Sequence, residues 1–257
     1  MISLLKIENL APFRSGVDYY IKELNVVIHQ PTYKEISMIG EKSLFIFINA
    51  INLSIDEVKA SNAFEELSEN EINNLKNFDL FLYFIKEKEL KKIFLSFMTL
   101  LFPNYITKIQ NDSISLKYKI DTGDEIEAVI NQFNFEIFKV HINMIFPMRE
   151  TLTGEKYNTK GKIANEIKEK LLKGRMKTGE QSQEEDSIDV FGRYCLIISI
   201  GNSLDYDKTL SLTIAQINQQ YIAYCHKREY ENYKDLMLAG AKDLEPVQDW
   251  FLSTTLE

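Results

Sequence analysis

Hydrophobic residues in the first part of the chain recur in patterns that are typical of helices and of a short strand. The longest helical pattern lies in residues 78–102, where apolar residues recur at three-and-four spacing until Pro103 ends it. A second apolar run, residues 43–53, has helical length and is expected to be buried. Residues 24–29 are rich in β-branched side chains, which predicts a short strand that ends at Pro31.

The residues after this strand carry the signal of a helix start. Thr32 and Glu35 have the spacing of a capping box, in which a hydroxyl and a carboxylate each accept a hydrogen bond from a free backbone amide. A helix is therefore expected to begin directly after Thr32. The pattern at residues 56–67 predicts a further short helix.

Apolar and polar residues alternate in two neighbouring segments, residues 105–110 and 113–120. Alternation of this kind predicts strands, and the Asn111–Asp112 pair between them suits a two-residue turn, so we expect a β-hairpin. Residues 125–145 are then predicted to form one helix. Its apolar positions are Ile126, Ile130, Phe133, Ile137, Val140 and Met144.

The remainder of the chain is predicted to be helical. A polar linker at 151–162 precedes a short amphipathic helix, and a flexible acidic loop is expected at about 177–187. Residues 188–200 are apolar nearly all round, which is typical of a buried helix. Thr213 or Ser211 is expected to cap a last long helix that runs to Gly240. The apolar stripe of this helix consists of Ile214, Ile217, Tyr221 and Tyr224.

These elements predict an α+β protein that is predominantly α-helical. The small antiparallel β-hairpin or sheet belongs to an N-terminal α+β domain, residues 1–150. An all-helical C-terminal domain is expected over residues 151–257. The 16 Phe and 13 Tyr support folded structure, because disordered chains contain few aromatic residues.

Charge and composition exclude several classes of function. The net charge of −8 argues against a nucleic-acid partner, since phosphate neutralisation requires a basic surface. The longest uncharged run, residues 93–107, contains a proline and is too short to span a membrane. No signal peptide is evident, so we expect a soluble cytoplasmic protein. Cys195 and Cys225 are expected to be buried thiols, although spacing leaves a disulfide between them open.

No pattern of residues indicates catalysis. The histidines are His29, His141 and His226, and none has a second ligand at zinc-binding spacing. Phosphate-binding loops, dinucleotide fingerprints and nucleophile elbows are missing from the sequence. We therefore expect no enzyme activity, no metal and no cofactor.

Two features point to binding of another protein. The stripe formed by Ile214, Ile217, Tyr221 and Tyr224 can be core, or it can anchor a partner helix, and the two cases have the same spacing. The segment 156–177 carries eight basic and two acidic residues, and five acidic residues follow within 180–189. This charge is either a solvated helix face or a docking surface for an acidic partner. The docking surface would consist of Lys168, Lys170 and Lys173.

Two stretches resemble one known family. The first is IHQPTYKEISMIGEKSLFIFINAI at 28–51, and the second is LTIAQINQQYIAYCHKREYENYKDLMLAGAKDLEPVQDWF at 212–251. Both are similar to a family of virion-morphogenesis proteins encoded by tailed phages and prophages of Gram-positive bacteria. The segment KGKIANEI at 160–167 lies where that family has a similar segment.

The resemblance implies a non-catalytic role in phage tail assembly. Many members of the family are described as tail assembly chaperones, which coat the long, apolar, helical tape-measure protein. The first hypothesis is thus a chaperone-like protein in the cytoplasm of the bacterial host. The second is a structural subunit of the virion, in the tail, baseplate or neck, which would form homo-oligomers. The third is a phage-encoded protein that binds or inhibits a host component.

Overall fold

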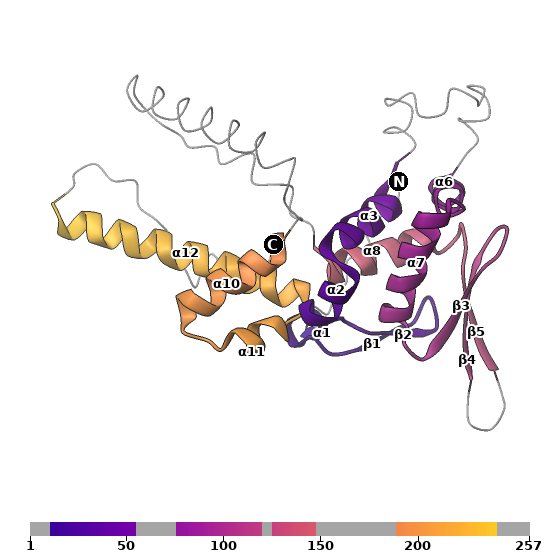
Figure 1. The fold of residues 1–257 in the computed structure, drawn as a ribbon, viewed down its shortest axis with the longest axis horizontal. Helices are drawn as coiled ribbons and strands as arrows, with labels where there is room; N and C mark the ends of the chain where they lie inside the picture. The colour runs from indigo at the N-terminus through magenta and orange to yellow at the C-terminus, as the bar shows by residue number, and fades with distance from the viewer. Residues whose placement is uncertain (1–10, 55–75, 120–124, 148–188, 241–257) are drawn as a thin grey trace, which may run out of the picture. The chain divides into compact units, whose positions relative to one another are not determined.

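A computed structural model describes residues 11–54, 76–119, 125–147 and 189–240 (Figure 1). The fold is α+β and dominated by helices, with two small antiparallel sheets in the N-terminal part and helices over 190–240, which confirms the predicted class. Several predictions lie outside the described residues. These are the short helix at 56–67, the linker 151–162, the helix that follows it, the loop 177–187, and Lys168, Lys170 and Lys173.

The first described elements are a short helix and a hairpin. Helix α1 (Ala11–Ser15) leads into β1 (Tyr19–Ile21), which pairs antiparallel with β2 (Val26–Ile28). Asn25 closes the turn in the left-handed region with φ 54, a conformation that asparagine tolerates well. Strand β2 lies inside the segment predicted as a strand, and it buries Val26 and Ile28.

The predicted capping box is present at the start of helix α2 (Tyr33–Ile39). Thr32 Oγ1 accepts from the amide of Glu35 at 3.3 Å, and the Glu35 carboxylate accepts from the amide of Thr32 at 2.8 Å. Gly40, with φ 97, then separates α2 from α3 (Glu41–Asn52). A side chain at Gly40 would be strained by this φ value, so the sharp change of direction depends on glycine.

The pattern at 78–102 forms two helices, and the prediction of a single one is wrong. Helix α6 (Asn77–Phe84) ends before Ile85, and α7 (Lys88–Leu101) starts after Glu87. The Glu87 carboxylate accepts from the amide of Leu90 at 2.8 Å and so caps α7. Both helices bury their apolar faces in the same core. The three-and-four spacing of apolar residues therefore continues from α6 into α7, although the helix is interrupted between them.

A three-stranded antiparallel sheet follows α7, with its strands in the order β3-β4-β5. Strands β3 (Tyr105–Ile109) and β4 (Ile114–Lys119) make the predicted hairpin, and the amide of Gln110 donates to the carbonyl of Ser113 across its turn. The helix predicted over 125–145 is wrong in its first third. Residues there form β5 (Glu125–Ile130), and helix α8 (Phe135–Ile145) starts afterwards.

There is a simple physical reason why residues 125–130 form a strand although their spacing also fits a helix. Ile126 and Ile130 are four residues apart, which fits one face of a helix and equally one face of a strand. Pairing with β4 decides between them, because it places Ile130 opposite Ile114 and Ala128 opposite Leu116 in the core. Asn134 fixes the end of the strand by donating to the carbonyl of Val129 at 2.8 Å.

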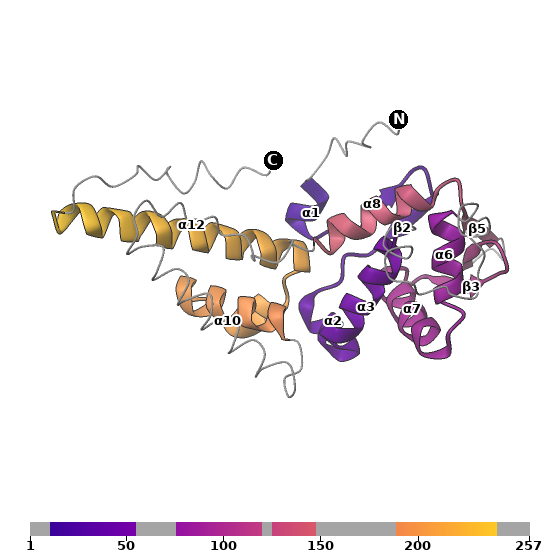
Figure 2. The same cartoon turned by 90° about the horizontal axis from the view of Figure 1, so that it is seen from above.

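Three helices make up the described C-terminal part. They are α10 (Val190–Asn202), α11 (Tyr206–Leu210) and α12 (Ile214–Leu238), and α10 runs beside the first half of α12 in both views (Figures 1 and 2). Thr213 caps α12 through a capping box with Gln216, which confirms one of the two predicted caps. The expectation that α10 is buried all round is wrong, since Leu196 and Ile200 are exposed.

One hydrophobic core includes residues from both parts of the described chain. Phenylalanine dominates it, with Phe47, Phe81, Phe94, Phe97, Phe102, Phe135, Phe138 and Phe146 almost fully buried. From the C-terminal helices, Phe191, Cys195, Ile198, Ile214 and Ile217 join the same cluster. The described parts of 11–147 and 190–240 thus belong to one compact unit. The predicted boundary at residues 150–151 lies outside the described residues.

Candidate interaction surfaces on the C-terminal helices

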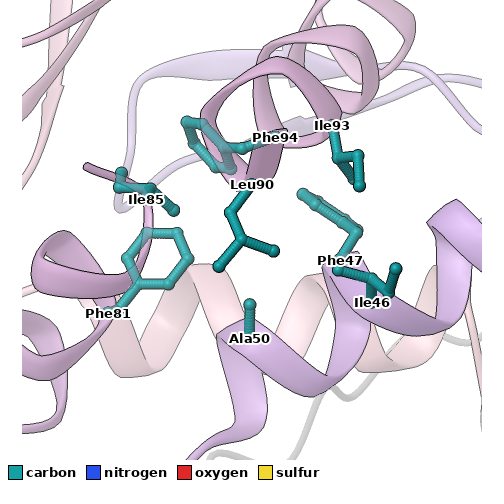
Figure 3. Close-up of a pocket in the computed structure, with 8 residues that line it drawn as sticks. All are labelled: Ile46, Phe47, Ala50, Phe81, Ile85, Leu90, Ile93 and Phe94. Atoms are coloured by element: carbon teal, nitrogen blue, oxygen red, sulfur yellow. The ribbon is translucent and has the colours of Figure 1, made fainter. Parts of the chain in front are cut away.

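The cavity between α3, α6 and α7 is too small for a ligand (Figure 3). Its eight lining side chains are all hydrocarbon and come from Ile46, Phe47, Ala50, Phe81, Ile85, Leu90, Ile93 and Phe94. The cavity volume is about 10 Å³, which is room for a single water-sized sphere. An apolar space of this size is a packing defect of the core rather than a binding site.

His29 lies between two carboxylates on the surface of the N-terminal part. Its Nδ1 is 2.8 Å from Asp18 Oδ1, and its Nε2 is 3.5 Å from Glu35 Oε1. Burial raises the pKa of Glu35, but hydrogen bonds from Thr32 and the nearby His29 outweigh it and hold the pKa below its ordinary value. Over the described ranges, no group of three or more His, Cys, Asp or Glu side chains is arranged to hold a metal ion.

A half-buried pair joins β1 to α8. The Tyr19 hydroxyl and His141 Nδ1 share a hydrogen bond of 2.9 Å. Burial raises the pKa of Tyr19, and burial also lowers the pKa of His141. Both groups are therefore neutral near pH 7, and the pair contributes to packing without a charge.

Acidification should destabilise the fold through His141. Its pKa in the folded chain lies below the ordinary 6.5, so the unfolded chain takes up the proton first as the pH falls below 6.5. The free energy of unfolding should then decrease toward the lower pKa of the folded state. Urea unfolding at pH 7.5 and at pH 5 measures this loss, which should be smaller in a His141→Gln variant. Equal losses in both proteins would contradict the assignment.

Exposed apolar side chains gather at two places on the C-terminal helices. The first, which we name the α10 stripe, consists of Leu196, Ile197, Ile200 and Leu204, exposed by 49, 36, 73 and 43%. The second, the α12 tip, consists of Leu236, Met237 and Leu238, exposed by 50, 55 and 86%. Single exposed apolar residues elsewhere, such as Met38 and Phe133, require no functional explanation.

The partner-binding residues predicted on α12 fall into two groups. Ile214 and Ile217 have no exposed surface and belong to the core, so they can bind a partner only if this end of α12 opens. Tyr221 and Tyr224 are half-buried. The Tyr221 ring stacks on Tyr194 of α10, with ring centroids 3.9 Å apart and an interplanar angle of 10°. The tyrosines thus join α12 to α10.

Gly201 allows α10 to approach α12 at the second tyrosine. A Cβ atom on Gly201 would lie 2.1 Å from Tyr224 Cε2, far inside van der Waals contact. Helix α10 includes Gly201 and ends at Asn202. The glycine is required for close packing between helices rather than for helix termination.

Substitution of Gly201 tests this contact. Gly201→Ala should lower the free energy of unfolding by about 1–3 kcal/mol, because the Tyr224 ring must move away from α10. In a Tyr224→Ala background the same change should be neutral or stabilising, since alanine favours a helix by up to about 1 kcal/mol over glycine. Chemical unfolding of the four proteins gives the comparison. A similar loss in both backgrounds would show that the ring is not the obstacle.

A side chain 150 residues away positions the start of α10. Glu41, the first residue of α3, is only 6% exposed. Its carboxylate accepts hydrogen bonds from the amides of Val190, Phe191 and Gly192 at 2.7, 3.0 and 3.1 Å. The first amides of a helix have no partner within it, so Glu41 caps α10 from a distant part of the chain. The orientation of the α10 stripe therefore depends on α3.

Sequence reasoning missed the α10 stripe and misplaced one cysteine. Arg193 is the sole charged residue of α10, and this composition predicted burial all round. The sequence held no signal for the stripe, because an apolar helix face has the same composition whether it is covered or exposed. Cys195 is buried as expected, but Cys225 is exposed on the part of α12 beyond the core, and no disulfide joins the two.

Comparisons with known proteins give no relative for this chain. No family model, no curated protein and no solved structure matches it. None of the described helices combines the length and the apolar character needed to span a membrane.

Proposed function

We propose that this protein is a non-catalytic binding protein of phage tail morphogenesis, which holds an apolar helix of a tape-measure-type tail protein during assembly. The observation that carries the binding role is the exposed length of α12. Only Ile214, Ala215, Ile217 and Asn218 of this 25-residue helix are buried. The 14 residues after Tyr224, from Cys225 to Leu238, lie beyond the contacts with α10 and extend over about 21 Å of helix.

The exposed part of α12 suits a protein partner. Lys227, Arg228 and Lys234 balance Glu229, Glu231 and Asp235, so it carries no net charge. Arg228 and Lys227 pair with Glu231 at 3.1 and 4.0 Å, and such pairs support an exposed helix by a few tenths of a kcal/mol each. The α12 tip then offers an apolar end that a partner helix would cover.

The assignment to phage tails rests on the resemblance of residues 28–51 and 212–251 to virion-morphogenesis proteins. The second of these stretches contains all of α12, so the region of the resemblance and the exposed helix coincide. A protein that binds the apolar helix of a tape-measure-type protein acts in the cytoplasm of the bacterial host, before the tail tube closes around that helix. It needs no cofactor and no nucleic acid.

Purified phage particles and infected-cell lysate provide the decisive comparison. Mass spectrometry should find the protein missing from mature particles, while affinity capture from lysate should retrieve a long helical tail protein. Presence in particles at a fixed copy number would instead support the alternative of a structural subunit in the tail, baseplate or neck. Capture of a host protein, with normal particle assembly in its absence, would support the host-interaction alternative.

A pair of matched variants tests the α12 tip. Leu238→Glu should reduce capture of the tail protein about tenfold or more, because a charge enters the apolar contact. Met38→Glu on α2 is the control, since Met38 and Leu238 are equally exposed at 86%. Quantitative pull-down of both variants beside the wild type measures the effect. Equal capture by the two variants would remove the α12 tip from the binding surface.

A further inference from the structure

Three lysines form a positively charged surface at the start of α7, which we name the α7 lysine face. Lys88, Lys91 and Lys92 are spaced by three and four residues, so their side chains are neighbours on the surface of the helix. All three are exposed, because burial on α7 begins only at Phe94. The face is therefore open to a partner.

Neighbouring carboxylates leave these charges unpaired. Glu89 is the sole acidic residue of α7, and among the described residues neither it nor the three lysines form an ion pair. The Glu87 carboxylate instead accepts from the amides of Glu89 and Leu90 at 3.2 and 2.8 Å. From Leu90 to Asn111 the sequence contains no Asp or Glu, although 38 of the 257 residues are acidic. The face is thus a local positive region on a chain with a net charge of −8.

The lysines are unfavourable for the stability of α7 itself. Lys88 is the first residue of the helix, where the positive end of the helix dipole favours acidic side chains. Lys88 and Lys92 are like charges four residues apart, a spacing at which they repel each other. Side chains that oppose local stability in this way are expected at functional sites. An oppositely charged partner would relieve both effects.

We propose that the α7 lysine face binds an acidic segment of a protein partner. Opposite charge steers such a segment to the face and fixes where it binds. A nucleic-acid strand fits less well, because its phosphates continue beyond the three lysines and meet a chain with a net charge of −8. A short acidic segment carries its carboxylates only where the lysines lie. This surface is on α7, whereas the proposed tail partner binds α12, so either proposal can fail without the other.

Fluorescence anisotropy of the full chain with a labelled peptide of glutamate and alanine tests the surface. At about 0.1 M salt, screening confines the interaction to charges within about 10 Å. The triple variant K88E/K91E/K92E should bind the peptide about tenfold more weakly than the wild type. The control K22E/K34E/K208E changes the net charge equally at three other exposed lysines and should bind nearly as the wild type. A wild type that does not bind the peptide, or equal losses in both variants, would overturn the proposal.

A milder variant separates binding from stability and keeps the test valid if the triple variant fails to fold. K88Q/K92Q removes the repulsion between the two lysines, so its Tm should equal or exceed that of the wild type. Its affinity for the peptide should nevertheless fall about threefold or more. A lower Tm would show that the lysines stabilise α7, which would remove the reason for a partner. A single-stranded oligonucleotide of equal charge should bind more weakly than the peptide, and tighter binding would make nucleic acid the partner and refute the proposal.

Discussion

Glu41→Ala should lower the free energy of unfolding by about 2–4 kcal/mol. The substitution removes the acceptor of three amide hydrogen bonds at 2.7, 3.0 and 3.1 Å, and hydrogen bonds to a charged group are worth about 1.5–3 kcal/mol. Phe191 and Gly192 are buried, so water does not replace the lost carboxylate easily. The first turn of α10 should fray before the rest of the core unfolds.

Denaturant unfolding measures the loss, and hydrogen exchange locates it. Exchange of the amides of 190–192 should accelerate in the Glu41→Ala variant more than exchange within α7. Glu41→Gln retains one acceptor oxygen and should cost about 1–2 kcal/mol. The control is Glu89→Ala in the first turn of α7, where an exposed carboxylate should matter by less than about 0.5 kcal/mol. A Glu41→Ala variant as stable as this control would disprove the capping role.

Phe47→Ala should have the largest effect of any single truncation considered, about 3–5 kcal/mol. The Phe47 ring is 2% exposed and lies 4.7 Å from the ring of Phe97 and 6.1 Å from that of Phe94, centroid to centroid. The Phe47 side chain also lines the small cavity of Figure 3, so truncation to alanine would enlarge a cavity that is already present in the core. The lost transfer free energy of the ring and the larger cavity then both lower the free energy of unfolding.

Phe133→Ala is the matched control for this truncation. Phe133 is 83% exposed at the turn before α8, and its loss should change the free energy of unfolding by less than about 0.5 kcal/mol. Urea unfolding followed by circular dichroism compares the two variants with the wild type. Similar midpoints for Phe47→Ala and Phe133→Ala would mean that α3 does not pack as described.

Features that depend on a few neighbouring residues could be read from the sequence. Thr32 with Glu35, and Thr213 as the cap of the last helix, use hydrogen bonds over three residues, so their spacing carries the information. The turn between β3 and β4 is equally local. Aromatic content and helical period together gave the fold class, because a chain so rich in Phe must bury it on regular elements.

The candidate surfaces could be predicted only in part, since burial is not a local property. Ile214, Ile217, Tyr221 and Tyr224 share one helix face in any α12, yet two became core and two became contacts to α10. The α10 stripe escaped prediction because an apolar helix surface has the same composition whether or not something covers it.

The sequence by itself determined where α2 and α12 begin, and that the protein combines a small sheet with many helices. The tertiary structure alone decided that 125–130 pair as a strand, that α6 and α7 separate at Glu87, and that Glu41 caps α10. The physical reason is distance along the chain. Capping and turn hydrogen bonds form within a few residues, whereas strand pairing, burial and the Glu41 contact join residues that meet only once the core has assembled.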